Sequence, residues 1–532
     1  LVGVLYVLDE PSIGLHQRDN RKLIATLERL RDLGNTLIVV EHDEETIESS
    51  DWIVDIGPGA GEHGGRVLYS GPPDGLAGVT ESVTREYLFG GRGLPLRTPR
   101  EARSWLRLEN VTRNNLHDLT VDIPLGVFTA VTGVSGSGKS SLVSQALPSL
   151  LGDRLGQAVR GDDEPVSDES LLADAPEHLE GRVAGPVTGV QRLVVIDQRP
   201  IGRTPRSNVA TYTGLFDHVR RRFADTPEAR SRGYKPGRFS FNVAGGRCPT
   251  CEGEGFVMVE LLFLPSVYTP CPECHGTRYQ RSTLEITWHG RNIAEVLALS
   301  VDEAFEFFDS EPEVRRSLAA LRDVGLGYLT LDRQSRTLSG GEVQRINLTT
   351  ALGTSLTKTL FVLDEPSIGL HPRDLNRIVE AMHRLRDAGN TLVVVEHDPS
   401  VMLAADRLID MGPGPGERGG SIIYDGAPEA IRSSGTLTGE YLGGRRHVAD
   451  AAHWSQRPVD DSTPRIVLEG ATEHNLRDVT VEIPLQRLVC VTGVSGSGKS
   501  TLLQDVLYPA MARHFGLATE SPGAFRSLTG AD

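Results

Sequence analysis

Residues 133–142 read GVSGSGKSSL, and residues 493–502 read GVSGSGKSTL. Both fit the pattern G-x-x-x-x-G-K-[ST], in which glycines turn backbone N–H groups around phosphate oxygens, a lysine adds positive charge and a hydroxyl ligates Mg²⁺. Each follows a strand-length apolar run, at 128–132 and 488–492, and precedes a segment expected to be helical, whose N-terminus favours anions. A glycine-rich turn that matches by chance is the alternative, but the flanks and the second copy favour two nucleotide sites.

We expect both phosphate-binding loops (P-loops) to hold ATP and Mg²⁺. The first loop supplies Gly133, Ser135, Gly136, Ser137, Gly138, Lys139, Ser140 and Ser141. The second loop supplies Gly493, Ser495, Gly496, Ser497, Gly498, Lys499, Ser500 and Thr501.

Composition is that of an ordinary globular protein. The 532 residues predict about three to four domains, and no apolar run is long enough to span a membrane. The net charge of −16 argues against a protein that coats nucleic acid over its whole surface. The sequence opens at Leu1 inside an apparent buried strand, so we expect it to be a fragment of a longer chain, in which a missing targeting signal proves little.

A long internal repeat organises the chain. The stretch LYVLDEPSIGLHQRDN at 5–20 recurs as LFVLDEPSIGLHPRDL at 360–375, and the stretches at 34–43 and 55–65 recur after the same shift. Within each copy, continuous apolar runs alternate with helical periodicity, which is typical of a mostly parallel sheet covered by helices. We therefore predict an α/β fold of P-loop nucleotide-binding units, with ligands at the carboxyl ends of the strands.

Each copy of the repeat ends an apolar strand in two carboxylates, Asp9-Glu10 and Asp364-Glu365. The aspartate can hold Mg²⁺ through water, opposite the hydroxyl of Ser140 in the complete copy, and the glutamate can polarise the attacking water. A strand that merely happens to end in acids is the alternative. The repetition beside a P-loop favours a catalytic role for Glu10 and Glu365.

A histidine ends the next predicted strand in each copy, His42 and His397, both within VVEHD. We predict that these histidines contact the terminal phosphate. A lone histidine is more often structural, but two copies at the same place favour function.

Four of the five cysteines form two C-x-x-C pairs, CPTC at 248–251 and CPEC at 271–274. At this spacing Cys248, Cys251, Cys271 and Cys274 can present four thiolates to Zn²⁺, and the glycines that follow each pair favour zinc over a redox site. With all four ligands from protein the site would be structural and would fix a protruding loop or hairpin. We expect the fifth cysteine, Cys490, to be a core residue.

A basic segment precedes the cysteines. Residues 199–247 contain eleven Lys and Arg against three acids, with aromatic residues interspersed. The aromatic residues are Tyr212, Phe223, Tyr234, Phe239 and Phe241. Such a segment can track a phosphate backbone and stack on bases; a solvated basic face is the alternative.

The octapeptide LSGGEVQR at 338–345, with Gln198 in IDQ, resembles the signature and glutamine loop of the ATP-binding-cassette family. The resemblance implies that the signature closes over ATP held by a partner cassette, so that two cassettes sandwich two nucleotides. The signature residues are Ser339, Gly340, Gly341 and Glu342. Gln198 would be a catalytic-site residue.

Further stretches resemble the UvrA family, the DNA-damage-recognition ATPases of bacterial nucleotide excision repair. They include IDQRPIGRTPRSNVATYTG at 196–214, RGYKPGRFSFNVAGGRC at 232–248 and FLPSVYTPCPECHGTRY at 263–279. The resemblance implies a cytoplasmic ATPase that scans double-stranded DNA as a dimer, senses damage and loads a helicase partner, UvrB. A related DNA-binding ATPase for drug resistance is the alternative. A transporter ATPase would not carry the zinc insertion.

The chain departs from the family in that a further P-loop follows the zinc-bearing cassette, which suggests a tandem or enlarged paralogue. The second DEPSIGLHPRD also looks like the family's first cassette. We expect the C-terminal half of a first cassette at 1–75, a linker at 76–105, a complete cassette at 106–430 with an insertion at about 199–290, a linker at 431–465 and the start of a further cassette at 466–532. The acidic stretch at 161–181 should be an exposed excursion.

Overall fold

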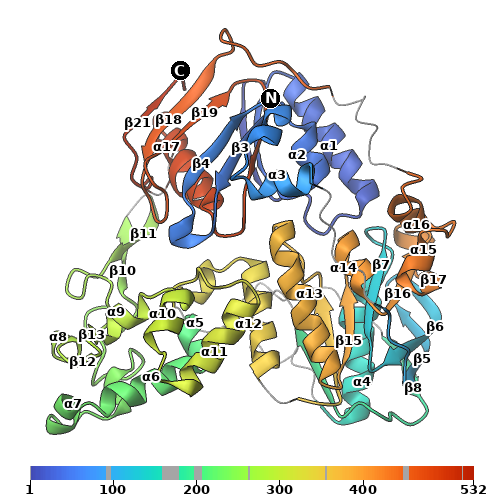
Figure 1. The fold of residues 1–532 in the computed structure, drawn as a ribbon, viewed down its shortest axis with the longest axis horizontal. Helices are drawn as coiled ribbons and strands as arrows, with labels where there is room; N and C mark the ends of the chain where they lie inside the picture. Colours follow the sequence, from blue (N-terminus) through green and yellow to red (C-terminus); the bar gives the residue numbers. More distant parts are fainter. Residues whose placement is uncertain are drawn as a thin grey trace.

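Two α/β bodies stack on one another in the computed structural model (Figure 1). One is built from both ends of the chain and the other from its middle. The structure describes residues 2–90, 98–157, 179–196, 206–261, 264–353, 356–446, 455–517, 519 and 521–531. The predicted α/β class is confirmed. No helix in these ranges is long and apolar enough to cross a membrane.

The middle of the chain forms the central cassette, whose six-stranded sheet has the order β17-β16-β7-β15-β14-β9. All neighbours are parallel except β16 and β17. The strands are β7 Phe128–Gly133, β9 Arg192–Ile196, β14 Thr359–Asp364, β15 Thr391–Val395, β16 Arg407–Gly412 and β17 Ser421–Gly426. The apolar runs that precede the P-loop, the carboxylates and the histidine are thus β7, β14 and β15, because parallel strands buried on both faces need continuous apolar sequence.

Both ends of the chain form the terminal cassette, whose five-stranded sheet has the order β1-β2-β20-β3-β4. Its strands are β1 Leu5–Asp9, β2 Thr36–Val40, β3 Trp52–Gly57, β4 Arg66–Gly71 and β20 Leu488–Thr492. The P-loop strand β20 pairs in parallel with β2 and with β3. This arrangement differs from the expected division, in which the last segment began a further cassette: here it completes the first segment.

A buried ion pair ties the two ends together. Arg31 Nη1 lies 2.9 Å from Asp51 Oδ1, and both side chains are fully buried. The other carboxylate oxygen of Asp51 accepts a hydrogen bond from the backbone N–H of Leu488, at 2.7 Å. Removing one member of such a pair costs about 3–5 kcal/mol, since it leaves a charge buried without its partner. The start of β20 is therefore fixed by a side chain more than four hundred residues away.

A small antiparallel sheet covers each parallel sheet. In the central cassette it has the order β6-β5-β8, and in the terminal cassette β19-β18-β21. The strands are β5 Ser104–Arg113, β6 Leu116–Leu125, β8 Glu180–Ala184, β18 Arg465–Ala471, β19 Val479–Pro484 and β21 Ser527–Thr529. Apolar residues of the small and large sheets share one buried cluster in each cassette.

Helices pack on both sides of the large sheets and build most of the insertion. Those of the terminal cassette are α1 Gln17–Asp32, α2 Glu44–Ser49, α3 Val83–Leu88 and α17 Tyr508–His514. Those of the central sheet are α4 Leu147–Leu155, α13 Pro372–Asp387, α14 Pro399–Ala404, α15 Pro428–Ile431 and α16 Leu437–Leu442. The helices α3 and α16 fall in the two segments expected to be linkers. Each P-loop opens into a π-helical segment, Ser141–Ala146 and Thr501–Leu507.

The insertion and the residues that follow it, as far as the signature helix, form a helical subdomain of the central cassette. Its helices are α5 Val209–Tyr212, α6 Leu215–Ala224, α7 Pro227–Ser231, α8 Arg281–Leu284, α9 Ile293–Leu297, α10 Val301–Phe307, α11 Pro312–Asp323 and α12 Gly340–Gly353. Two hairpins accompany them, β10 Phe256–Leu261 with β11 Leu264–Pro270, and β12 Thr287–Trp288 with β13 Arg291–Asn292. The first hairpin projects from the cysteine cluster toward the terminal cassette (Figure 1). Gln198 and residues 161–178 of the acidic stretch lie outside the described residues.

The two cassettes contain the same tryptophan–arginine contact with the partners exchanged. Arg465 stacks on Trp52 in the terminal cassette, with its guanidinium carbon 5.1 Å from the ring centroid. Arg407 stacks on Trp105 in the central cassette, at 4.8 Å. Arg407 stands at the repeat position of Trp52, and Arg465 at that of Trp105. Pairing either half with the wrong P-loop segment would therefore oppose two tryptophans or two arginines, which favours the observed pairing.

Exchanging this contact tests the assignment of halves to cassettes. Arg407→Trp or Trp105→Arg alone should each lower the free energy of unfolding by about 0.5–1 kcal/mol, because the cation–π contact is lost. The double variant should recover most of that loss, since it reproduces the arrangement of the terminal cassette. Urea unfolding measures all three variants. Additive losses in the double variant would contradict the exchange.

Candidate functional site

The first P-loop lies at the carboxyl end of β7, as predicted. Lys139 is buried, and its ammonium donates to the carbonyls of Gly133 and Val134 at 3.0 and 3.1 Å. Burial lowers its pKa to about 8, while nearby carboxylates, Glu365 first, oppose the shift. The adjacent Ser140 is exposed and so accessible to a metal ion. This combination of an accessible hydroxyl and a cation is what a phosphate with bound Mg²⁺ requires.

Glu365 and Glu10 share a backbone conformation that is uncommon for residues with a side chain. Their φ angles are +48° and +44°. Each amide donates to the end of the neighbouring strand, Glu365 to Val395 and Glu10 to Val40, both at 2.9 Å. Left-handed backbone costs of order 1 kcal/mol and persists where the surroundings fix it, often at functional sites. Both glutamates are thus held in one orientation at the mouth of a site.

The predicted histidines lie beside these glutamates. His397 Nε2 is 3.4 Å from Glu365 Oε1, and His42 Nε2 is 3.5 Å from Glu10 Oε1. Burial lowers the pKa of both imidazoles, that of His42 well below its usual range. The rings are therefore neutral near pH 7, so each can donate from one nitrogen without adding charge.

The aspartates of the two pairs contact the π-helical segments behind the P-loops. Ser144 donates to Asp364 Oδ2 at 2.9 Å, and Gln504 donates to Asp9 Oδ2 at 2.5 Å. Burial raises the pKa of both aspartates. The positive charge of the P-loop lysine, Lys139 or Lys499, opposes that shift in each case, so each aspartate lies close enough to its P-loop to share a metal ion with it.

The signature lies opposite the second P-loop, across the boundary between the cassettes. Tyr328 donates to Glu342 Oε1 at 2.6 Å, and a Cβ added to Gly496 would lie 2.8 Å from the Tyr328 ring. Burial raises the pKa of Glu10, although Lys499 and Arg345 of the signature helix oppose the shift. One site therefore brings together a P-loop from the chain end, carboxylates from the chain start and a signature from the middle. The LSGGE motif occurs once in this sequence.

Within the signature, Ser339 and Glu342 cap helix α12 reciprocally. Ser339 N donates to Glu342 Oε2 at 2.8 Å, and Glu342 N donates to Ser339 Oγ at 3.3 Å. Gly341 leaves no room for a side chain, since a Cβ there would lie 2.5 Å from the carbonyl of Ile368. The helix N-terminus thus has a fixed direction toward the second P-loop, as an anion site needs.

Three P-loop serines accept hydrogen bonds from other parts of the protein. Ser141 is buried and accepts a hydrogen bond from Asn114 Nδ2 at 3.1 Å. Ser135 accepts from the backbone N–H of His16 at 3.5 Å, and Ser495 from that of His371 at 3.3 Å. Because each histidine belongs to the opposite cassette, Ser135 and Ser495 lie at the contact between the cassettes.

We call residues 11–16 and 366–371 the crossing loops, because each reaches the facing cassette. Gly14 lies against Glu365, and Gly369 lies against Glu10; a Cβ would be 2.8 and 2.9 Å from the respective Oε2 atoms. Both glycines have positive φ, +68° and +65°. Only glycine therefore lets a crossing loop pass the carboxylate of the facing site.

Sequence reasoning missed the residues that hold the crossing loops. Glu41 accepts from the amides of Ser12 and His42, at 2.8 and 3.1 Å, and burial raises its pKa to about 7. Glu396 accepts equivalently from Ser367 and His397, both at 3.0 Å. Both glutamates precede the histidine in the repeated VVEHD, so the repeat itself was the signal that could have found them.

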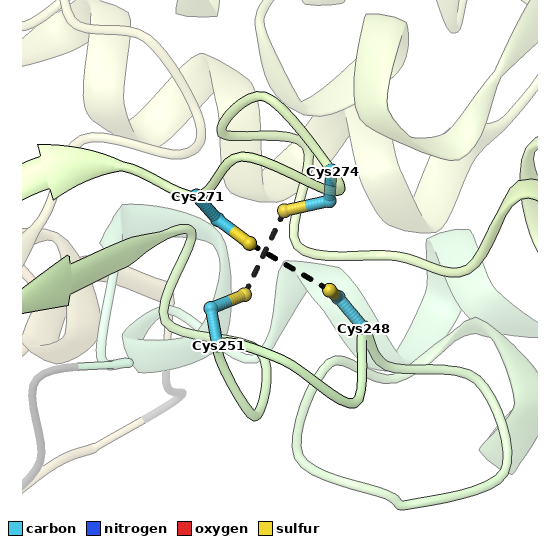
Figure 2. Close-up of side chains that lie close together, drawn as sticks. All are labelled: Cys248, Cys251, Cys271 and Cys274. Carbon is cyan, nitrogen blue, oxygen red and sulfur yellow. Dashed lines mark hydrogen bonds between the residues drawn. The ribbon is translucent and has the colours of Figure 1, made fainter.

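The four cysteine sulfurs point toward one another in a buried cluster (Figure 2). Their Sγ atoms all lie within 4.8 Å of each other, with 3.9 Å between Cys248 and Cys271 and 3.6 Å between Cys251 and Cys274. A tetrahedral zinc site with Zn–S bonds of about 2.3 Å has sulfur–sulfur distances of about 3.8 Å. The donor set and its spacing therefore fit Zn²⁺. The hairpin β10–β11 connects the two C-x-x-C pairs, as expected.

The aromatic residues of the basic segment do not form a stacking surface. Phe223, Phe239 and Phe241 are fully buried in the core of the insertion. Tyr234 lies under Arg238, and Tyr212 donates to Asn347. The prediction that these side chains stack on bases is therefore wrong for the three phenylalanines, because the helical subdomain needs them as its own core.

Acidic partners also occupy much of the positive charge. Ion pairs bind Arg222 to Glu311, Arg230 to Asp225, Arg232 to Glu228 and Glu285, and Arg247 to Glu252. The segment is thus less available to a phosphate backbone than its sequence suggested. Arg199 and Arg203 lie outside the described residues.

Two P-loop cassettes that face one another, with paired carboxylates, histidines and a signature shared across the contact, define an ATP-binding-cassette protein. Residues 301–404 match the family model described as "AAA domain, putative AbiEii toxin, Type IV TA system". UvrABC system protein A of Methanothermobacter thermautotrophicus is 54% identical over 445 residues, 83% of this chain and 45% of the relative. That of Thermus thermophilus is 52% identical over 447 residues, 83% and 45% of the two chains.

A solved structure of similar fold is UvrA2 from Deinococcus radiodurans, with a TM-score of 0.77 and 54% identity, covering 84% of this chain and 52% of that one. The chain belongs to the UvrA family. It spans about half the length of the curated relatives it matches.

Gly369→Ala tests the contact between a crossing loop and Glu10. The new methyl group would displace the Glu10 carboxylate, so ATP hydrolysis should fall at least tenfold, within the range of a mispositioned catalytic base. Gly389→Ala is the matched control, since Gly389 also has positive φ, +92°, but has no atom within 4 Å of an added Cβ. Both variants should lose about 1 kcal/mol of unfolding free energy. Equal hydrolysis rates in the two variants would contradict the contact.

Proposed function

We propose that this chain is part of an ATPase that recognises damaged double-stranded DNA in nucleotide excision repair. Membership of the UvrA family at 54% identity is the observation that carries the proposal. The proposal includes action in the cytoplasm and loading of a UvrB-like helicase. Pairing of cassettes within one chain, as in this structure, or between two copies would bring the nucleotide sites together.

Among the described residues, the second P-loop is the one that the signature faces, and ATP hydrolysis is proposed for that site. Lys499 and the loop amides would hold the phosphates, and Ser500 with Asp9 would hold Mg²⁺, which neutralises developing charge on the phosphoryl oxygens when bound. Glu10 would orient the attacking water, and burial makes its carboxylate a stronger base. The neutral imidazole of His42 would donate to the terminal phosphate. The N-terminus of α12 would complete the site from the facing cassette.

The cysteine cluster would hold Zn²⁺ with a structural role, because all four positions of a tetrahedral site are filled by protein sulfur. Its position at the base of β10–β11 supports a role in fixing that hairpin, which projects toward the terminal cassette (Figure 1). The salt-bridged arginines favour a DNA surface that includes more than the basic segment.

Zinc binding is tested on the purified chain. We expect one Zn²⁺ per chain by metal analysis and its loss in Cys274→Ser, with ATP binding retained because none of the four cysteines belongs to a P-loop. Cys490→Ser is the matched control and should retain zinc, since Cys490 lies buried in β20. Full zinc content in Cys274→Ser would contradict the four-thiolate site.

Damage recognition is tested by the affinity for one duplex with and without a bulky lesion, at fixed salt and with ATP. We expect tighter binding of the lesion duplex. The affinity for either duplex should fall steeply with salt, because phosphate contacts release counterions. Equal affinity for both duplexes would favour a DNA-binding ATPase without lesion recognition, and binding to neither would contradict the DNA partner.

A further inference from the structure

Each crossing loop ends in a histidine that no predicted role uses, His16 and His371. Both are buried, and both stand immediately before a sixteen-residue helix, α1 or α13. Each ring accepts a hydrogen bond at Nδ1 from a backbone amide of its own helix, that of Arg18 or Arg373, at 3.2 Å in both cases. Each histidine therefore caps the N-terminus of its own helix through Nδ1.

The opposite ring nitrogen contacts the other cassette. His371 Nε2 lies 3.4 Å from Thr84 Oγ1, and Thr84 donates to Asp55 Oδ1 at 3.0 Å. In the other copy His16 Nε2 lies 3.3 Å from Thr438 Oγ1, which donates to Asp410 Oδ1 at 3.0 Å. The same His–Thr–Asp series of hydrogen bonds thus crosses the boundary between the cassettes twice, in opposite directions.

The hydrogen-bond directions follow from the geometry. Because Nδ1 of His371 accepts from an amide, the single proton of the neutral ring must be on Nε2. Nε2 then donates to Thr84, whose own hydroxyl proton goes to Asp55. Burial keeps the ring neutral: it lowers the pKa of His371 well below its usual range, and that of His16 to about 3. A protonated ring would also lose its Nδ1 acceptor.

Each of these hydrogen-bond series reaches a nucleotide site of the facing cassette. The ring of His371 lies edge-on to that of His42, with 5.7 Å between centroids, and its amide donates to Ser495 of the second P-loop. Thr84 also lies 3.5 Å from Thr492 Oγ1, at the end of the P-loop strand β20. The ring of His16 lies similarly edge-on to His397, at 6.2 Å.

We propose that His371 and His16 are positioning residues that hold each crossing loop against the nucleotide site of the facing cassette through a His–Thr–Asp hydrogen-bond chain. The inference rests on the proposed ATPase function. At the second P-loop, which the signature faces, the chain His371–Thr84–Asp55 aligns the crossing loop that contacts Glu10. Turnover there then depends on a residue of the other cassette that belongs to neither P-loop.

His371→Asn separates the two contacts of the ring. Asparagine still caps α13, since its short side chain accepts from the same helix amides, but it cannot reach Thr84. Thr84→Val removes the chain from the other side while keeping the shape of the side chain. We expect each variant to lower kcat for ATP about tenfold, as for a buried hydrogen bond lost from an aligned site, with KM within about twofold of the unaltered chain.

The double variant shows whether the two residues act as one unit. His371→Asn with Thr84→Val should be no slower than either single variant, because both break the same chain. Thr84→Ser, which keeps the hydroxyl, should retain the unaltered rate. Thr26→Val, an exposed threonine on α1, is the control for the substitution itself and should not change the rate.

Unaltered kcat in both single variants would overturn the inference alone, and so would independent, multiplying losses in the double variant. A loss that Thr84→Ser does not rescue would also overturn it, since the hydroxyl would then not matter. Absence of ATP hydrolysis by the unaltered chain is a different result. It would overturn the proposed function, and the inference with it.

Discussion

Parallel pairing of β20 between β2 and β3 is the constraint on which the rest of the structure depends. Without β20 the first part of the chain carries carboxylates and a histidine but no P-loop, and without β1 to β4 the last part carries a P-loop but no carboxylates. The pairing joins Leu37 to Leu488, so the loop that it closes contains the whole central cassette. The entropic cost of closing a loop grows only slowly with loop length. Such a closure therefore adds little to the free-energy cost of folding once the central cassette is folded.

Site geometry follows from that closure. The buried Asp51 fixes the start of β20, and the N–H of Glu10 bonds to the end of β2. Since β2 and β20 are neighbours, the register of one pairing sets the distance between Lys499 and the carboxylates. The crossing loop of the central cassette then packs against Glu10, and a glycine is required where they meet. The register of the sheet therefore sets both the contact of the crossing loop and the geometry of the site.

Local patterns in the sequence predicted the local parts of this structure. The P-loops, the acid pairs, the histidines and the cysteine cluster were all found, because each is a short motif whose chemistry fixes its spacing. The order of strands was not predicted, since a continuous apolar run such as Thr36–Val40 does not indicate which strands it pairs with. Thr84 was missed because a lone threonine in a segment without periodicity carries no signal. Phe239 was wrongly predicted to stack on bases, since aromatic residues beside arginines in the sequence can equally belong to a hydrophobic core.

The two proposed nucleotide sites are alike in their own cassettes. Each has a P-loop lysine with a lowered pKa near 8, a glutamate in left-handed backbone and a neutral histidine. Among the described residues, the signature lies beside the second loop. The crossing contacts, by contrast, are made in both directions, with nearly equal distances. Each P-loop region is therefore in direct contact with a crossing loop of the other cassette, whichever of the two hydrolyses ATP.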